Sequence, residues 1–200
     1  MVEAFFTTLQ QQLHCPLDTW TNVEKAYAGR AYHNLGHLDE MLTHLAKHPP
    51  PRDPLIFGIA LVYHDIVHKP TRSDNEIRSA DSATRLLEQE GSFDPQRIDR
   101  CRELILATKE HVPSDHDDGD EALLIDLDLA VLAREPVEYD RYTAALRKEF
   151  WMVPGFVFRN GRRNVLTTFL DRPQIFRTEK GYADYEAPAR ENLWRELREL

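Results

Sequence analysis

The stretch DPLIFGIALVYHD, residues 53–65, decides the fold class. Pro54 suits the first turn of a helix, where its missing N–H group would have no partner anyway. The residues that follow are apolar on every side of a helix, and a helix with this pattern is buried. We therefore expect a buried helix that ends at the polar pair His64 and Asp65.

Helical patterns also occupy most of the remaining chain. Apolar residues recur at helical spacing over residues 36–48, and Pro49 cannot continue that helix. No segment alternates apolar and polar residues as a strand does. Further helices are expected over residues 2–13, 74–90, 95–110, 121–133, 136–151, 161–171 and 182–199. The sequence thus predicts an all-α, compact helical bundle with one domain over residues 1–200.

Local signals mark the ends of several of these helices. Thr21 with Glu24, and Ser73 with Glu76, have the spacing of capping boxes, in which two side chains satisfy free backbone N–H groups. Gly91 has the residue type that ends helices. We expect these residues to set helix boundaries.

The composition limits the classes of function. The net charge of −9 argues against a surface for duplex nucleic acid, which needs a basic face, but not against a small phosphorylated ligand. No apolar run approaches membrane-spanning length and the first residues lack the pattern of a signal peptide, so no membrane partner is expected. The two cysteines form neither a disulfide framework nor a zinc-finger pattern, which makes the cytoplasm the expected compartment.

The first chemical signal is the pair His64 and Asp65. A buried carboxylate without a partner costs several kcal/mol or shifts its pKa. The end of a helix disfavours negative charge by a further ~0.3–1 kcal/mol. A bound cation would remove both costs. A bond between the two side chains, or to a neighbouring arginine, explains the pair equally well.

Two histidines stand four residues apart in AYHNLGHLDEML, residues 31–42. His33 and His37 would share one helix face, in line with Met41, if the helix starts early enough. A single histidine on an apolar face is usually a core residue. Two histidines in register, together with the histidines and aspartates later in the chain, favour a functional site.

Two aspartates, Asp126 and Asp128, interrupt the apolar segment EALLIDLDLAVLA, residues 121–133. Residues two apart on a helix point about 200° away from each other, so both cannot face one site. One could bind a cation, while the other caps, pairs or reaches solvent. Mixed histidine and carboxylate ligands suit Mn, Fe, Co, Ni or Zn better than Mg, with one or two ions. An open coordination position would lower the pKa of a bound water.

The ordered set His37, His64-Asp65 and Asp128 resembles the HD superfamily of metal-dependent phosphohydrolases. YHNLGH, residues 32–37, is similar to the YHNxxH signature of the cyclic-nucleotide phosphodiesterases, which are distant members. NEIRSA at 75–80, TKEH at 108–111 and DLDLAVL at 126–132 resemble a bacterial subgroup of predicted HD hydrolases. The resemblance covers about residues 30–135, and residues 136–200 would be a C-terminal helical extension.

This resemblance implies metal ligands at His37, His64, Asp65 and Asp128, with Asp126 as the alternative to Asp128. His33 matches the residue that protonates the leaving oxygen in the phosphodiesterases; a histidine bonded near a helix start is the alternative.

Several further residues are weaker candidates, each with a plain structural explanation beside it. Glu76 resembles the acid that orients water in some HD nucleotidases, although the capping box also explains it. His111 could complete a second metal site, contact phosphate or lie on the surface, and His68 is a weaker candidate ligand. Possible phosphate partners are Lys109, Arg30 and Arg147.

Other polar and aromatic segments have no predicted chemical role. We expect the acidic loop SDHDDGD, residues 114–120, to be solvated, because it lacks the ligand spacing of an EF-hand. We also expect a surface position for Arg159, Arg162 and Arg163, and a core position for Phe150, Trp151, Phe156 and Phe158.

The leading functional hypothesis is a phosphohydrolase in which metal-activated water attacks a phosphate ester of a nucleotide or small metabolite. Alternatives are a cyclic-nucleotide-type phosphodiesterase, a di-iron HD-type oxygenase and a non-catalytic ligand-binding module. Residues 136–200 would shape the mouth of the pocket or form the surface of a homodimer. Fold alone does not fix the substrate.

Overall fold

The computed structural model describes residues 1–200, and every regular element in it is a helix. The elements are α1 (Val2–Gln10), α2 (Trp20–Tyr27), α3 (Leu35–Leu45), α4 (Pro54–Tyr63), α5 (Asn75–Glu90), α6 (Pro95–Glu110), α7 (Asp120–Leu129), the 3₁₀ helix η1 (Ala130–Ala133), α8 (Pro136–Glu149), α9 (Gly155–Leu170) and α10 (Glu179–Glu199). The prediction of an all-α fold is confirmed.

Helix α4 is the buried helix that the sequence predicts. Its apolar side chains from Ile56 to Tyr63 are each at most 1% exposed, and it packs against α1, α5, α6 and α7. Asp53 caps its first turn by accepting a hydrogen bond from the backbone N–H of Ile56. A methyl group on Gly58 would lie 2.7 Å from a terminal carbon of Leu9, so glycine is what lets α1 approach this closely.

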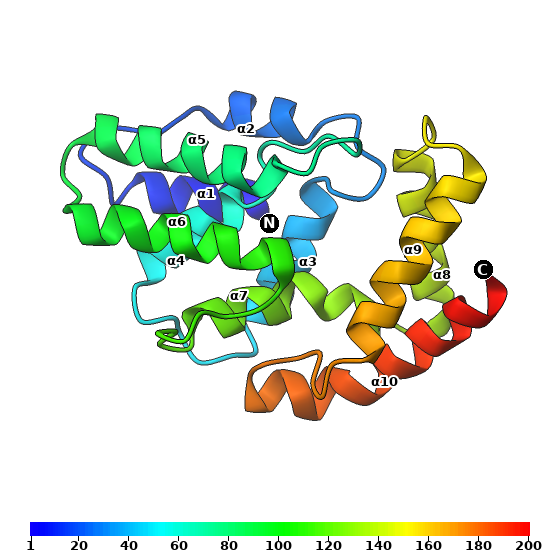
Figure 1. Ribbon diagram of the computed structural model, residues 1–200. Helices are drawn as coiled ribbons and strands as arrows, with labels where there is room; N and C mark the ends of the chain where they lie inside the picture. Colours follow the sequence, from blue (N-terminus) through cyan, green and yellow to red (C-terminus); the bar gives the residue numbers. More distant parts are fainter.

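Two apolar cores lie side by side. Helices α1–α7 enclose the first, and the second forms where the end of α7 and η1 meet α8, α9 and α10. Figure 1 shows α8–α10 as a separate group of helices beside the first bundle, next to α3 and α7. The C-terminal segment thus borders the end of α7, where Asp128 lies.

Several helix ends differ from those predicted. Thr19, not Thr21, caps α2, by accepting a hydrogen bond from the backbone N–H of Asn22. The capping box at Ser73 is also wrong. Asp74 is the residue before α5, and its carboxylate binds Arg72 and Arg78 instead of the helix backbone. Helix α5 does end at Gly91, which has a φ of 80°.

The last helices begin earlier than predicted. Helix α9 starts at Gly155 and α10 at Glu179, where the side chain of Thr178 accepts a hydrogen bond from the backbone N–H of Gly181. Helix α3 starts at Leu35, after its cap Asn34. His33 therefore lies outside the helix, and the two histidines do not share a helix face.

The predicted surface and core positions in the C-terminal segment are partly wrong. Trp151, in the turn after α8, is 73% exposed, and Phe156, in the first turn of α9, is 65% exposed. Arg162 is buried, since its guanidinium lies 2.7 Å from Glu196 and also reaches the hydroxyl of Tyr139.

The acidic loop is more ordered than a solvated loop would be. The carboxylate of Asp117 accepts hydrogen bonds from the backbone N–H groups of Gly119, Glu121 and Ala122 at the start of α7. It also lies 3.2 Å from Arg100. A carboxylate is favoured at a helix N-terminus, which explains this arrangement without a calcium ion.

Candidate metal centre

The C-terminal end of α4 presents a nitrogen that no protein group satisfies. His64 follows the last residue of α4, and its Nδ1 lies 2.9 Å from the carbonyl oxygen of Leu61. Because a carbonyl oxygen only accepts, Nδ1 carries a hydrogen, so Nε2 is the ring nitrogen that could bind a metal. His64 Nε2 is buried without a hydrogen-bond partner, 3.4 Å from Asp65 Oδ2 and 3.7 Å from Asp128 Oδ1.

Helix α3 brings His37 to the same place. Its Nε2 lies 2.9 Å from Asp128 Oδ1 and its Nδ1 lies 3.2 Å from the hydroxyl of Tyr32. Tyr32 thus orients the ring through Nδ1 and leaves Nε2 facing Asp128; metal-binding histidines usually have such a partner on the ring nitrogen that does not bind the metal.

These side chains form a group that could hold a metal ion. His37, His64 and Asp65 are all buried, and each offers one ligand atom within 4.8 Å of the others. Asp128 reaches the group from α7. The residues come from separate helices that the first core packs together, so the fold supplies the rigidity that a metal site needs.

The two aspartates of α7 point in different directions, as the helical geometry requires. Asp128 faces the histidines. Asp126 is fully buried and accepts hydrogen bonds from the backbone N–H groups of Arg177 and Thr178 and from the Thr178 hydroxyl. Asp126 also leaves no room for a side chain at Gly181. It therefore anchors the start of α10.

This contrast gives a stability prediction. Asp126→Asn removes the charge and one acceptor oxygen from the N–H groups before α10, and is expected to lower the free energy of unfolding by about 2–3 kcal/mol. Urea unfolding would measure the loss. Metal content should stay at the wild-type level. A variant that folds but loses its metal would show that Asp126 belongs to the metal site and does not only anchor α10.

A second group lies beside the first. His33 Nδ1 is 2.5 Å from Glu149 Oε1, and His68 Nε2 is 2.9 Å from the same oxygen. The two imidazoles stack with centroids 4.0 Å apart. The other oxygen of Glu149 accepts hydrogen bonds from the backbone N–H groups of Tyr32 and His33. These three side chains could also hold a metal ion, since their ligand atoms lie within 4.8 Å of one another.

The electrostatics of both groups favour charged carboxylates and protonated His33 and His64 when no metal is bound. Burial lowers the pKa of His64, but Asp65 and Asp128 outweigh it and raise the pKa well above its ordinary value. Burial also opposes the charge on His33, whose pKa is raised by Asp65 and Glu149. Burial would raise the pKa of each carboxyl group, but the imidazoles around them hold the pKa values below their usual range.

These shifts predict how the stability of the metal-free protein depends on pH. The raised pKa values of His33 and His64 stabilise the fold below about pH 6.5, and this contribution is lost as the pH rises through the folded-state values. The lowered pKa values of the carboxyl groups stabilise it above about pH 4. With a chelator present, the melting temperature should therefore be highest between about pH 4.5 and 6.5 and fall towards pH 9.

Added Mn²⁺ should remove that fall above pH 6.5, because metal ligands must be deprotonated and metal binding then favours high pH. Melting curves at five pH values with chelator and with Mn²⁺ would test this. A melting temperature that rises from pH 6 to pH 9 in chelator would contradict it.

His111 joins the first group from the end of α6. It has a left-handed backbone with a φ of 51°, which is uncommon for a residue with a side chain. Its Nε2 lies 3.1 Å from Asp128 Oδ2, while its carbonyl oxygen accepts a hydrogen bond from Arg172. His111 is thus placed to touch either the metal group or a bound ligand, and not on the outer surface.

A cavity of about 570 Å³ opens beside both groups. We call it the site cavity. Its polar lining comes from His33, His68, Arg72, Asn75, Glu76, His111 and Arg162, and its apolar lining includes Leu146, Phe150, Val153, Val157, Phe158 and Val165. Glu76 thus faces the cavity, and the capping role proposed for it does not exist.

The predicted phosphate partners do not meet in this cavity. Lys109 is exposed on α6. The guanidinium of Arg30 donates to the carbonyl oxygens of Asp65 and Ile66, so it fixes the loop after α4. Arg147 donates to two carbonyl oxygens in the turn after α8. These contacts give both arginines structural roles.

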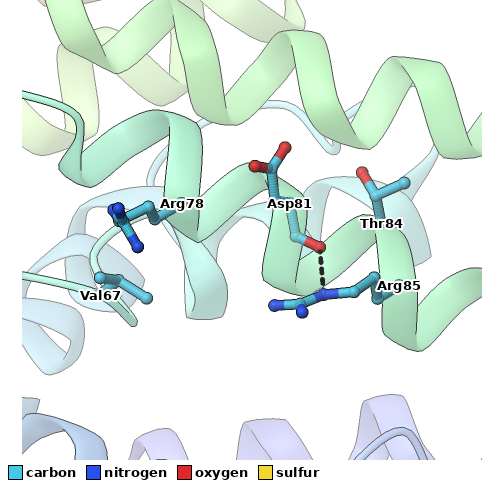
Figure 2. Close-up of a pocket in the computed structure, with 5 residues that line it drawn as sticks. All are labelled: Val67, Arg78, Asp81, Thr84 and Arg85. Carbon is cyan, nitrogen blue, oxygen red and sulfur yellow. Dashed lines mark hydrogen bonds between the residues drawn. The ribbon is translucent and has the colours of Figure 1, made fainter.

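Another hollow, of about 470 Å³, lies along α5 away from the histidines. Figure 2 shows its lining, in which Arg85 donates a hydrogen bond to the backbone oxygen of Asp81. Arg78 is already paired with Asp74. The hollow contains no histidine and no group of metal-binding residues.

Sequence reasoning missed Glu149 and Tyr32. One signal for Glu149 was available: it is the last residue of α8, where a negative charge is unfavourable unless something compensates it. Tyr32 is the first residue of the YHNLGH motif, but nothing in the sequence pattern assigns a partner to its hydroxyl.

Comparisons of this chain with protein-family models, with curated proteins and with solved structures found no match. None of the helices is both long enough and apolar enough to cross a membrane.

Proposed function

We propose that this protein is a metal-dependent phosphohydrolase whose metal is held by His37, His64, Asp65 and Asp128. The observation that carries the proposal is the buried Nε2 of His64, which has no hydrogen-bond partner and has two carboxylates within 3.7 Å. A divalent cation satisfies all three groups at once. The order of these residues, which resembles that of the HD superfamily, supports the same proposal.

The donor set fits a transition metal. It combines two imidazoles and two carboxylates, which suit Mn, Fe, Co, Ni or Zn. Such an ion would polarise a phosphate ester and lower the pKa of a bound water so that it can attack at neutral pH. The residues of the chain hold and orient the reacting groups and exclude bulk water from the buried side of the site.

His33 is the proposed proton donor. Its ring centroid lies 6.3 Å from that of His37, so it stands next to the metal group. Glu149 holds Nδ1, which leaves Nε2 to give a proton. A water adds its oxygen to phosphorus, the bond from phosphorus to the ester oxygen breaks, and His33 protonates that oxygen. The products are an alcohol and inorganic phosphate; the water gives its proton to solvent, from which His33 regains one.

Phosphate release with defined metals would test the proposal. The metal-free protein would be reloaded separately with Mn, Fe, Co, Ni, Zn or Mg and offered 4-nitrophenyl phosphate and bis(4-nitrophenyl) phosphate. We expect hydrolysis that depends on a transition metal, and preference between the two esters separates a monoesterase from a diesterase. Absence of hydrolysis of a broad panel of mono- and diesters by protein that has bound metal would contradict the proposal.

A second candidate function is oxidation at a di-iron centre. It is favoured by the second group of potential ligands, because His68 Nδ1 lies 4.0 Å from Asp65 Oδ1 and the two groups therefore adjoin. Two iron atoms per chain with a visible absorption band, in protein that hydrolyses no phosphate ester, would favour this function.

A further inference from the structure

We infer that the substrate is a phosphate ester whose alcohol part is apolar. The inference rests on the proposed function and adds a substrate class to it. It comes from the site cavity, which has a polar wall beside the metal group and an apolar wall formed by residues of the C-terminal segment. Pockets of about 300–1,000 Å³ typically enclose small organic ligands, and the volume of about 570 Å³ falls in that range.

The two walls come from different parts of the fold. His33, His68 and His111 carry the polar wall and belong to the segments around the first core. The apolar wall is built by the end of α8, the turn after it and α9. A ligand with its phosphate on the metal group would therefore place the rest of its structure against α8 and α9.

The apolar wall contains side chains that the protein itself leaves uncovered. Val157 is 45% exposed and Val165 44% exposed, and both line the cavity. Phe150 and Phe158 pack against each other with ring centroids 5.8 Å apart, and Arg147 lies over the ring of Phe158. An apolar ligand group would cover the two valines, and the removal of this apolar surface from water would favour binding.

The charges around the cavity disfavour a polyphosphate. Arg162 is bound to Glu196, and Arg72 is bound to Asp74 through two nitrogens. Arg147 donates to carbonyl oxygens. No arginine of the lining is left to bind a second or third phosphate group. The cavity thus fits one phosphate with an apolar group better than a nucleoside triphosphate.

A series of straight-chain alkyl phosphates would test the inference. Ethyl, butyl and hexyl phosphate have the same chemistry at phosphorus and differ only in apolar length. With the metal-loaded protein, kcat/KM should rise about two- to fourfold for each added methylene group, as expected when apolar surface is buried. Equal values for the three esters would overturn the inference and leave the proposed function intact.

Substitutions on the apolar wall would locate the effect. The double variant Val157→Ser/Val165→Ser changes two side chains that are already partly exposed, so it should fold; a melting curve would verify this. It should lose at least about tenfold in kcat/KM for hexyl phosphate relative to ethyl phosphate. Val137→Ser alters a valine that is 64% exposed on α8 and does not line the cavity, so it is the matched control.

Binding of alkylphosphonates, which cannot be hydrolysed, separates the two proposals. Calorimetry with ethyl- and hexylphosphonate should show tighter binding of the longer ligand to wild type and to Val137→Ser, and a smaller difference for the double variant. That result in a protein without phosphatase activity would support the apolar ligand and contradict the proposed function. Equal binding of both phosphonates by all three proteins would overturn the inference.

Discussion

Asp65→Asn is expected to abolish metal-dependent hydrolysis almost completely, with a loss of about 10³-fold or more in kcat. The substitution keeps the size of the side chain and the backbone oxygen that binds Arg30. It removes the negative charge that balances a cation and replaces one oxygen of the carboxylate, whose Oδ2 lies 3.4 Å from His64 Nε2, by an amide NH2 group. Initial rates with 4-nitrophenyl phosphate at saturating Mn²⁺ would measure the loss.

The matched control is Asp140→Asn. Asp140 is an exposed aspartate on α8 that pairs with Arg195, which is not a residue of the metal group. We expect wild-type rates and wild-type metal content for this variant. An Asp65→Asn protein that keeps more than about a tenth of the wild-type rate would show that Asp65 is not a ligand.

Glu149→Gln is expected to have the second largest effect. Its carboxylate orients His33 and helps to raise the pKa of that imidazole against the opposing effect of burial. For an alkyl phosphate, whose leaving oxygen needs a proton, kcat should fall about 10²-fold or more. For 4-nitrophenyl phosphate, whose leaving group departs as an anion, the loss should be several times smaller.

The pH profile gives an independent measure of the same role. A general acid works while it is protonated, so activity is lost as the pH rises through the pKa of His33. Removing Glu149 lowers that pKa and should shift the alkaline limb of kcat to lower pH. Glu138→Gln, on the same helix and paired with Arg141 at the surface, should leave the profile unchanged. Equal losses for both types of ester would contradict proton donation through His33.

The helices whose sequences carry strong local signals could be predicted. Helix α4 is apolar on all sides, has Pro54 at its first position and ends at a polar pair, so its burial and its limits follow from the sequence. Because successive residues of a helix are rotated by about 100°, Asp126 and Asp128 also had to point in different directions. Which of the two faced the histidines depended on where α10 begins, because the N–H groups of Arg177 and Thr178 satisfy Asp126.

Other features depend on contacts between distant segments and could not be predicted. Trp151 and Phe156 are large and apolar, but the turn after α8 and the first turn of α9 leave them exposed. Glu149 contacts His33, from which it is separated by 116 positions in the sequence, and no local sequence pattern predicts a contact over that separation. The apolar wall of the site cavity likewise exists only because α8 and α9 pack beside the first bundle.

The metal content of the folded protein tests the central claim most directly. Wild type, Asp128→Asn and Asp126→Asn would be grown with Mn, Fe, Ni and Zn available, dialysed, and analysed for every transition metal, with circular dichroism to show that each is folded. We predict about one or two ions per chain in wild type and in Asp126→Asn, and almost none in Asp128→Asn. Folded wild type that binds no metal even after reloading, or Asp128→Asn that keeps the full amount, would contradict the account.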